Sequence, residues 1–344
     1  MLIKFKNLTK ILQGRKGSFS DENKSALILL GLIWAVFIGI LICVVLYIST
    51  GERFTIIRLI SYLGPWLAGL LFFLIVVSAL MRKKIIAISM FVLAVLISIP
   101  YVRLFVPSST EPTLGQQIYK VMTYSKMGRN HDISSVAKVV SSEKPDLLFM
   151  QEIDKQESEK LIQLLSRTYT GSTLFYLIDK GLILSHYKIR TRHHNKTSYS
   201  KSAEIDFPEM SILGWNVHLQ KSVVNTDVQY KMTNQLVEEV SLVQSPVILA
   251  GDFNATMLNY PYRKIKRNLN LNNAFEQSGF GFGFTFPTPA RRLGLITPFM
   301  RIDHIFFNDY FNIHDAYVVN ESGGSDHYPV VALFSLNTIP KQKS

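Results

Sequence analysis

The sequence contains very little cysteine: Cys43 is the single one among 344 residues, and it lies within an apolar stretch. This excludes a disulfide framework within the chain, and it also excludes a zinc site built on a cysteine cluster. The sequence shows no internal repeat and no low-complexity tract. A folded part of this chain must therefore be stabilised by an ordinary hydrophobic core, which a domain of about 200 residues can provide.

Charge is absent from three long apolar runs in the first third of the chain. These runs are Ala26–Ile48, Leu59–Met81 and Ile85–Val102. Because a helix needs roughly 20 apolar residues to cross the hydrocarbon core of a bilayer, we expect three transmembrane helices within residues 25–106. The first run is longer than the apolar region of a cleaved signal peptide, and it begins farther from the N-terminus.

The net charge of +12 is concentrated around these runs. Residues 1–106 hold 12 basic and three acidic residues, whereas the rest of the chain holds 25 basic and 22 acidic residues. Basic loops stay on the cytoplasmic side, so we expect the basic N-terminal segment 1–24 and the loop at Arg82–Lys84 there. With three spans, the chain after residue 106 would lie on the outer side, periplasmic or extracellular, of a bacterial cytoplasmic (inner) membrane.

The outer part is predicted to be a linker over residues 107–117 and a single domain over residues 118–344. The linker is indicated by Pro107, Pro112 and Gly115, which lie close together. In the domain, helical patterns that begin at Asp132 and cover residues 234–243 alternate with strand patterns, which favours an α/β fold. The predicted strands are 118–124, 146–150, 182–185, 211–219, 246–250, 302–307 and 328–334.

Polar residues follow several of these strands. Asp252 and Asn254 come directly after a buried strand, where a carboxylate can take a proton from water and an amide can orient that water. The same two residues could instead close the strand as an Asx-turn. Asp303 lies inside an apolar strand, where a buried charge is costly unless it is paired, and a histidine from elsewhere would suit. His304 would face the other side of that strand as a structural residue.

Three further positions could belong to a site. Glu152 ends a strand and is a suitable ligand for a hard cation such as Mg²⁺. His218 closes another strand, and the Asp326–His327 pair follows two glycines. Taken singly, each of these residues could equally be an ordinary strand-end or turn residue.

In this order, the motifs resemble the endonuclease/exonuclease/phosphatase superfamily, which is also called DNase-I-like. The resemblance runs from about residue 115 to residue 336. It implies a four-layer α/β sandwich, with two central mixed sheets flanked by helices, and divalent-metal cleavage of phosphoesters. The matching stretches are VMTYS at 121–125, KPDLLFMQEID at 144–154, ILSHYKI at 183–189, WNVHLQ at 215–220, LAGDFNAT at 249–256, TFP at 285–287, RIDHIF at 301–306 and SDHYPV at 325–330.

The resemblance also implies which residues carry the reaction. Asp252 would activate or orient the attacking water, with Asn254 beside it. Asp303 would pair with His327, which would face the scissile phosphate. His218 would contact the phosphate as a second imidazole.

The implied metal is Mg²⁺, and Mn²⁺ could serve in its place. Glu152 would bind it, and Asp326 would help to hold the metal or the substrate. The chain departs from the family at Ser125, where an asparagine usually ends the first strand. A serine hydroxyl is shorter and is a poorer metal ligand, so we expect this change to affect metal affinity more than the fold.

The leading hypothesis is a membrane-anchored phosphoester hydrolase whose partners are its substrate and the lipid bilayer; no protein partner is indicated. The substrate stays open between nucleic acid and a phospholipid headgroup. Basic stretches at 190–196 and 263–267 would suit a polyanion, and alternating phenylalanines at 280–286 would suit lipid. The alternative is a catalytically degenerate binding module, with Ser125 as the sign of decay.

Overall fold

The computed structural model describes residues 21–166, 174–178, 180–191, 200–221, 226–290 and 297–337. Most of the basic N-terminal segment and most of the 190–196 stretch therefore lie outside the described residues. The chain divides into two compact units. One comprises residues 1–49 with 66–97, and the other comprises residues 50–65 with 98–344.

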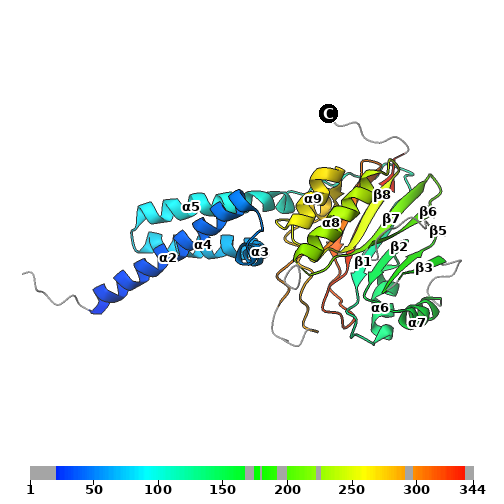
Figure 1. Ribbon diagram of the computed structural model, residues 1–344, viewed down its shortest axis with the longest axis horizontal. Helices are drawn as coiled ribbons and strands as arrows, with labels where there is room; N and C mark the ends of the chain where they lie inside the picture. Colours follow the sequence, from blue (N-terminus) through cyan, green and yellow to red (C-terminus); the bar gives the residue numbers. More distant parts are fainter. Residues whose placement is uncertain are drawn as a thin grey trace, which may run out of the picture. The chain divides into compact units, whose positions relative to one another are not determined.

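The first unit is built from three apolar helices, α2 (Asp21–Thr50), α4 (Gly64–Leu80) and α5 (Lys84–Ser98) (Figure 1). A narrow stripe of each helix is buried against its neighbours, for example Ile33, Leu71 and Met90. Many other large apolar side chains of these helices are exposed. Helices that are hydrophobic on all sides are typical of membrane spans.

Two helices are long and apolar enough to cross a membrane, namely Lys24–Thr50 and Lys84–Phe105, the second of which joins α5 to the 3₁₀ helix η1 (Ile99–Phe105). The expected middle span is divided between α3 (Thr55–Ser61) and α4, which are bent at the break between them. Pro65 lacks a backbone N–H and fits the first turn of a new helix. The described part of the chain thus contains two candidate spans, and a third only if the bent pair is counted as one.

The second unit contains two six-stranded sheets. Sheet A has the order β11 (Phe311–Val318), β12 (Val330–Leu336), β1 (Tyr119–Ser125), β2 (Leu147–Gln151), β4 (Gly181–Ser185) and β3 (Leu174–Ile178). Sheet B has the order β5 (Lys188–Thr191), β6 (Ser200–Asp206), β7 (Ser211–His218), β8 (Val247–Asp252), β10 (Asp303–Phe307) and β9 (Asn272–Asn273). Each sheet has one parallel pair, β1 with β2 and β7 with β8, and its other pairs are antiparallel.

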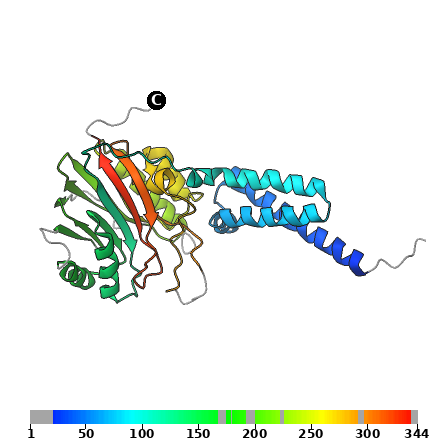
Figure 2. The same cartoon turned by 180° about the vertical axis from the view of Figure 1, so that it is seen from behind.

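The two sheets pack face to face, and helices cover their outer faces (Figures 1 and 2). Alternate residues of each strand face opposite sides, so Val121 lies in the core between the sheets while Met122 packs against the outer helices. On sheet A the outer helices are α6 (Ile133–Glu143) and α7 (Lys155–Leu165). On sheet B they are α8 (Thr226–Ser241) and α9 (Tyr260–Leu269), and the short α10 (Ala274–Ser278) follows. The four-layer α/β sandwich is confirmed.

Local sequence signals account for many of these elements. The Asp132 side chain accepts the Ser135 N–H and caps α6, as its position predicted. All seven predicted strands are present, with small shifts at their ends. The elements that were missed are the strands β3, β5, β6, β9 and β11 and the helices α7, α9 and α10, together with the capping box of Asp154 and Glu157 that begins α7.

The predicted linker lies against the second unit. The Ser108 N–H donates to the Gln277 carbonyl at 2.7 Å, and the Thr110 N–H donates to the Ile313 carbonyl at 3.2 Å. Tyr101 and Leu104 of η1 are buried in the core between the sheets. The 3₁₀ helix η1 and the start of the predicted linker are thus part of the packing of this unit.

Candidate active site

The candidate site lies where the carboxyl ends of the two parallel strand pairs meet. In sheet A, β1 ends at Ser125, and Glu152 directly follows the end of β2. In sheet B, His218 and Asp252 end β7 and β8 and stand opposite each other in register. The carboxyl ends of parallel strands are where α/β sheets bind ligands.

Asp252 is buried at the end of β8 and is held by the loop that follows it. The backbone N–H of Asn254 donates to Asp252 Oδ1 at 2.8 Å, and its side-chain amide donates to Asp252 Oδ2 at 3.2 Å and to the Leu219 carbonyl at 2.9 Å. Asn254 has a left-handed φ of 46°, which asparagine tolerates well. The Asx-turn offered as the structural alternative is therefore present, and its carboxylate still belongs to the site.

Gly251 lets the β7 and β8 backbones approach closely beside Asp252. A Cβ atom at this position would lie 1.8 Å from the Val217 carbonyl oxygen. Any side chain here would push the two strands apart, and with them His218 and Asp252.

Asp303 and His327 form a buried pair. His327 Nδ1 lies 2.9 Å from Asp303 Oδ2, and both side chains are 1% exposed. A carboxylate beside Nδ1 keeps a proton on that nitrogen and so fixes the tautomer of the ring, while Nε2 faces a different group. Here Nε2 lies 3.8 Å from Asp252 Oδ2. The structure thus brings together the aspartate and the histidine that the resemblance pairs.

Burial and charge set the protonation of this group. Burial alone would lower the pKa of His327, but the carboxylates of Asp303 and Asp252 outweigh it and raise that pKa to about 9. Burial raises the pKa of Asp252 to about 7, although the charge of His327 opposes the shift. Near neutral pH, a charged imidazole therefore lies beside a carboxyl group whose pKa suits proton transfer.

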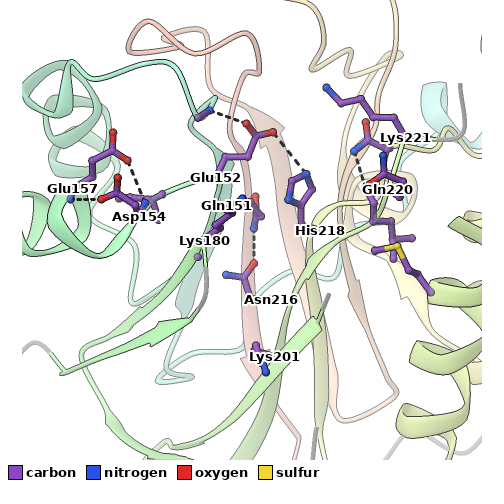
Figure 3. A pocket seen from close by; sticks show the side chains of 16 residues that line it. Gln151, Glu152, Asp154, Glu157, Lys180, Lys201, Asn216, His218, Gln220 and Lys221 are labelled. Carbon is purple, nitrogen blue, oxygen red and sulfur yellow. Dashed lines mark hydrogen bonds and ion pairs between the residues drawn. The ribbon is translucent and has the colours of Figure 1, made fainter. Parts of the chain in front are cut away.

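Glu152 and His218 face each other in the pocket, with 3.7 Å between Oε1 and Nε2 (Figure 3). The Gly128 N–H donates to Glu152 Oε2 at 2.7 Å. Burial opposes ionisation of Glu152, but the hydrogen bond from Gly128 contributes to a net lowering of its pKa. Burial lowers the pKa of His218, which favours the neutral imidazole. The pair therefore offers an ionised carboxylate and a neutral nitrogen, both of which are ligand forms.

Two overlapping groups among the described residues could hold a metal ion, with ligand atoms within 4.8 Å of one another. One is Glu152, His218 and Asp252, and the other is Asp252, Asp303 and His327. Oxygen donors with an imidazole fit a divalent cation.

Ser125 and Asp326 belong to neither of these two groups. The Ser125 hydroxyl is buried at the end of β1, and among the described residues it has no hydrogen-bond partner. An orphaned oxygen next to the strand that leads to Glu152 is compatible with a further ligand. Asp326 lies in neither group, and its Oδ1 is 3.9 Å from His327 Nε2.

A pocket of about 700 Å³ opens over Glu152, His218 and Asn254. Three lysines also line it: Lys180, Lys201 and Lys221. Lysine side chains supply positive charge to an anionic ligand. The pocket therefore suits a substrate that carries phosphate.

Two buried polar contacts near the site were not predicted. The Gln151 side-chain amide donates to Asn216 Oδ1 at 2.7 Å, and Asn216 Nδ2 donates to the Met150 carbonyl at 2.8 Å, so the two sheets are joined behind Glu152 (Figure 3). Lys126 is fully buried and pairs with Glu157 at 2.8 Å. The sequence signal that could have predicted both contacts is a polar residue within an apolar strand or directly after one.

Other sequence candidates lie away from the site chemistry. His304 is buried with Nε2 2.8 Å from the Ala255 carbonyl, in keeping with the expected structural role. In the second basic stretch, which forms part of α9, Lys266 pairs with Glu276. In the phenylalanine stretch, Phe282 stacks on Phe284 at 5.2 Å.

Comparison with known proteins gives a match in sequence. The profile of the Endonuclease/Exonuclease/phosphatase family matches residues 115–327, which is more than half of the chain. An uncharacterised protein of Acanthamoeba polyphaga mimivirus, L388, is 22% identical over 246 residues, which cover 58% of this chain and 89% of that protein.

Solved structures agree in fold. A family protein of Bacteroides thetaiotaomicron matches with a TM-score of 0.54 and 14% identity, over 67% of this chain and 100% of the other. One of Leptotrichia buccalis matches with a TM-score of 0.52 and 16% identity, over 63% and 100%. The chain belongs to the endonuclease/exonuclease/phosphatase family, whose name covers enzymes that hydrolyse phosphoester bonds.

Proposed function

We propose that this member of the endonuclease/exonuclease/phosphatase family is a divalent-metal-dependent phosphoester hydrolase that its apolar helices anchor in a membrane. The observation that carries the proposal is the convergence of Asp252, the Asp303–His327 pair and the Glu152–His218 pair at one end of two facing sheets. Ordinary packing has no need for so many titratable groups at one place.

The buried group would perform the proton chemistry. Asp252 takes a proton from the attacking water, because burial has brought its pKa to about 7. Asn254 holds that carboxylate in place through two hydrogen bonds. His327, kept charged by Asp303, donates from Nε2 to a phosphate oxygen as negative charge develops there. His218 contacts the phosphate from the pocket side.

The open side of the site would hold the metal. Glu152 would be the principal ligand, and Ser125 and Asp326 would complete the protein's share. When bound, Mg²⁺ or Mn²⁺ would supply positive charge that stabilises the phosphate oxygens in the transition state. The orphaned Ser125 hydroxyl supports this assignment.

The substrate class is a phosphodiester of a nucleic acid or of a phospholipid headgroup. Both carry the phosphate that the three pocket lysines would attract. A direct test assays the full-length chain in detergent with Mg²⁺ against plasmid DNA, single-stranded oligonucleotides, phospholipid and a generic phosphodiester. We expect metal-dependent turnover of one class, lost in Asp252→Asn and in His327→Ala. Asp309→Asn, at a half-buried carboxylate in the turn before β11, is the matched control.

A second candidate is a degenerate binding module, which the serine at position 125 favours. Titration calorimetry with Mg²⁺ separates the two functions. Absence of turnover together with absence of Mg²⁺ binding in the wild-type chain would favour the module. Turnover that depends on Asp252 would exclude it.

The orientation proposed for the catalytic domain is outside the bacterial cytoplasmic membrane. It follows from the basic residues at Arg82–Lys84, if the apolar helix α4 crosses the membrane between the two candidate spans. In a Cys43→Ser background, a cysteine at exposed Asn320 should react with an impermeant maleimide in intact cells, and one at Lys83 only after lysis. The reverse pattern would place the domain in the cytoplasm.

A further inference from the structure

The segment Thr50–Pro65, between the first two long helices, belongs to the same compact unit as the sheets. Its helix α3 buries Ile57, Arg58 and Ser61. A segment that merely connected two helices would have no reason to bury polar side chains against a distant part of the chain. Its hydrogen bonds show where it is held.

Glu52 binds the start of α9. Its carboxylate is 4% exposed and accepts hydrogen bonds from the Ser61 hydroxyl, the Asn259 side chain and the Tyr260 backbone N–H. Because Asn259 is the N-cap of α9, Glu52 places negative charge at the N-terminus of this helix, where the helix dipole favours it.

The same contacts extend into the loop after Asp252. Asn259 Oδ1 accepts the Thr256 N–H and the Thr256 hydroxyl, both at 2.7 Å. The Asn259 side chain also donates to the Ser61 hydroxyl at 2.7 Å. Residues 253–259, which join β8 to α9, are thus held from one side by Glu52 and Ser61.

Tyr62 reaches the site residue itself. Its hydroxyl donates to the Asn254 carbonyl oxygen at 2.7 Å, and the Gln229 side chain donates to the same oxygen at 3.1 Å. These two donors fix the peptide that follows Asn254, a residue in the left-handed region of φ. Asn254 in turn donates to both oxygens of Asp252. One chain of hydrogen bonds therefore runs from Tyr62 to the Asp252 carboxylate.

We propose that Thr50–Pro65 is a positioning element of the active site, in which Tyr62 orients Asn254 and, through it, the Asp252 carboxylate. The inference rests on the proposed hydrolase function for its kinetic consequence. It makes the connection between the apolar helices part of the catalytic machinery, so a change in this segment alters turnover without touching substrate.

The test compares Tyr62→Phe with Tyr310→Phe in the full-length chain in detergent. Each variant removes one tyrosine hydroxyl from a backbone carbonyl, and the Tyr310 contact, to Gln244, lies away from the site residues. We expect Tyr62→Phe to lower kcat about three- to tenfold, the effect of one neutral hydrogen bond, with KM and Tm unchanged. Tyr310→Phe should leave kcat unchanged.

Hydrogen exchange provides a readout that does not depend on turnover. Backbone amides of residues 254–258 should exchange faster in Tyr62→Phe and should stay unchanged in Tyr310→Phe. Equal kcat and equal exchange in Tyr62→Phe and wild type would overturn the inference, as would a loss of kcat that merely follows a loss of Tm. A wild-type chain without turnover would count against the proposed function. The hydrogen-exchange rates of residues 254–258 in Tyr62→Phe and wild type would still test whether Tyr62 positions this loop.

Discussion

The two sheets contribute unequal parts of the candidate site. On sheet B, the carboxylates of Asp252 and Asp303 are both buried, Asn254 donates to both oxygens of Asp252, and His327 pairs with Oδ2 of Asp303, whose Oδ1 has no partner among the described residues. On sheet A, β1 ends in Ser125, whose buried hydroxyl has no partner among the described residues. In the proposed function, the proton-transfer part of the site is thus organised largely by the protein's own hydrogen bonds, whereas the proposed metal side contains the serine that the sequence resemblance marks as a departure.

The difference follows from electrostatics. A buried carboxylate without a partner is costly, so the residues of sheet B could be kept only together with their donors. A buried serine hydroxyl costs far less when it is left unpaired. Sheet A can therefore tolerate a substitution that sheet B could not.

The largest effect should come from Asp252→Asn. The variant keeps the shape of the side chain and removes the group that takes the proton, so kcat should fall about 10³- to 10⁴-fold. Steady-state kinetics on the substrate found active will measure it, with Tm as the check on folding. A loss below tenfold would show that Asp252 is not the base.

Asp303→Asn should be next, with kcat/KM lowered about 10²- to 10³-fold. Burial lowers the pKa of His327, but the charges of Asp303 and, to a smaller extent, Asp252 raise it to about 9. Without the Asp303 charge this pKa falls, so the charged imidazole is lost at lower pH. The alkaline limb of the pH–rate profile should move to lower pH, and an unmoved limb would contradict the pairing role.

His304 tests the opposite face of the same strand. Burial lowers its pKa to about 3, from an unfolded value near 6.5. The unfolded chain binds more protons between these values, so stability falls as pH drops from about 6.5 towards 3, by an order of a few kcal/mol. His304→Gln should flatten this decline in thermal unfolding curves at stepped pH. Parallel curves for variant and wild type would refute the prediction.

The smallest effect is expected on sheet A. Ser125→Asn restores the amide usual in the family, and we expect Mg²⁺ affinity to rise about three- to tenfold, the effect of one added hydrogen bond or ligand. Ser125→Ala is the matched control and should lower affinity. Calorimetry that gives equal affinity for all three chains would remove Ser125 from the metal site.

Much of this molecule could be predicted from short stretches of sequence. The strand that ends at Asp252 and the cap at Asp132 depend on neighbouring residues only, because burial period and capping are local properties. His304 was placed correctly on the face opposite Asp303 because strand alternation is fixed. The break between α3 and α4 also has a local signal, the Gly64–Pro65 pair in the first turn of α4, but it was missed because it lies within a long uncharged run.

Other features depend on residues far apart in the chain. Gln151 meets Asn216, 65 residues away, and Tyr62 meets the Asn254 carbonyl, 192 residues away. No local pattern predicts such contacts, because they exist only after the sheets have packed. The unusual protonation of His327 likewise needs two carboxylates that separate strands deliver.

The residue types of the site, their order along the chain, the uncharged runs and the alternation that builds the two sheets can all be read from the amino-acid sequence. These are properties of single residues and of neighbours within a few positions. The buried cluster of Asp252, Asp303 and His327, and the contacts of the segment between two apolar helices with the loop beside that cluster, arise only when the chain folds. Distance and burial set both the strength of a charge and the partner of a hydrogen bond, and a linear sequence contains neither.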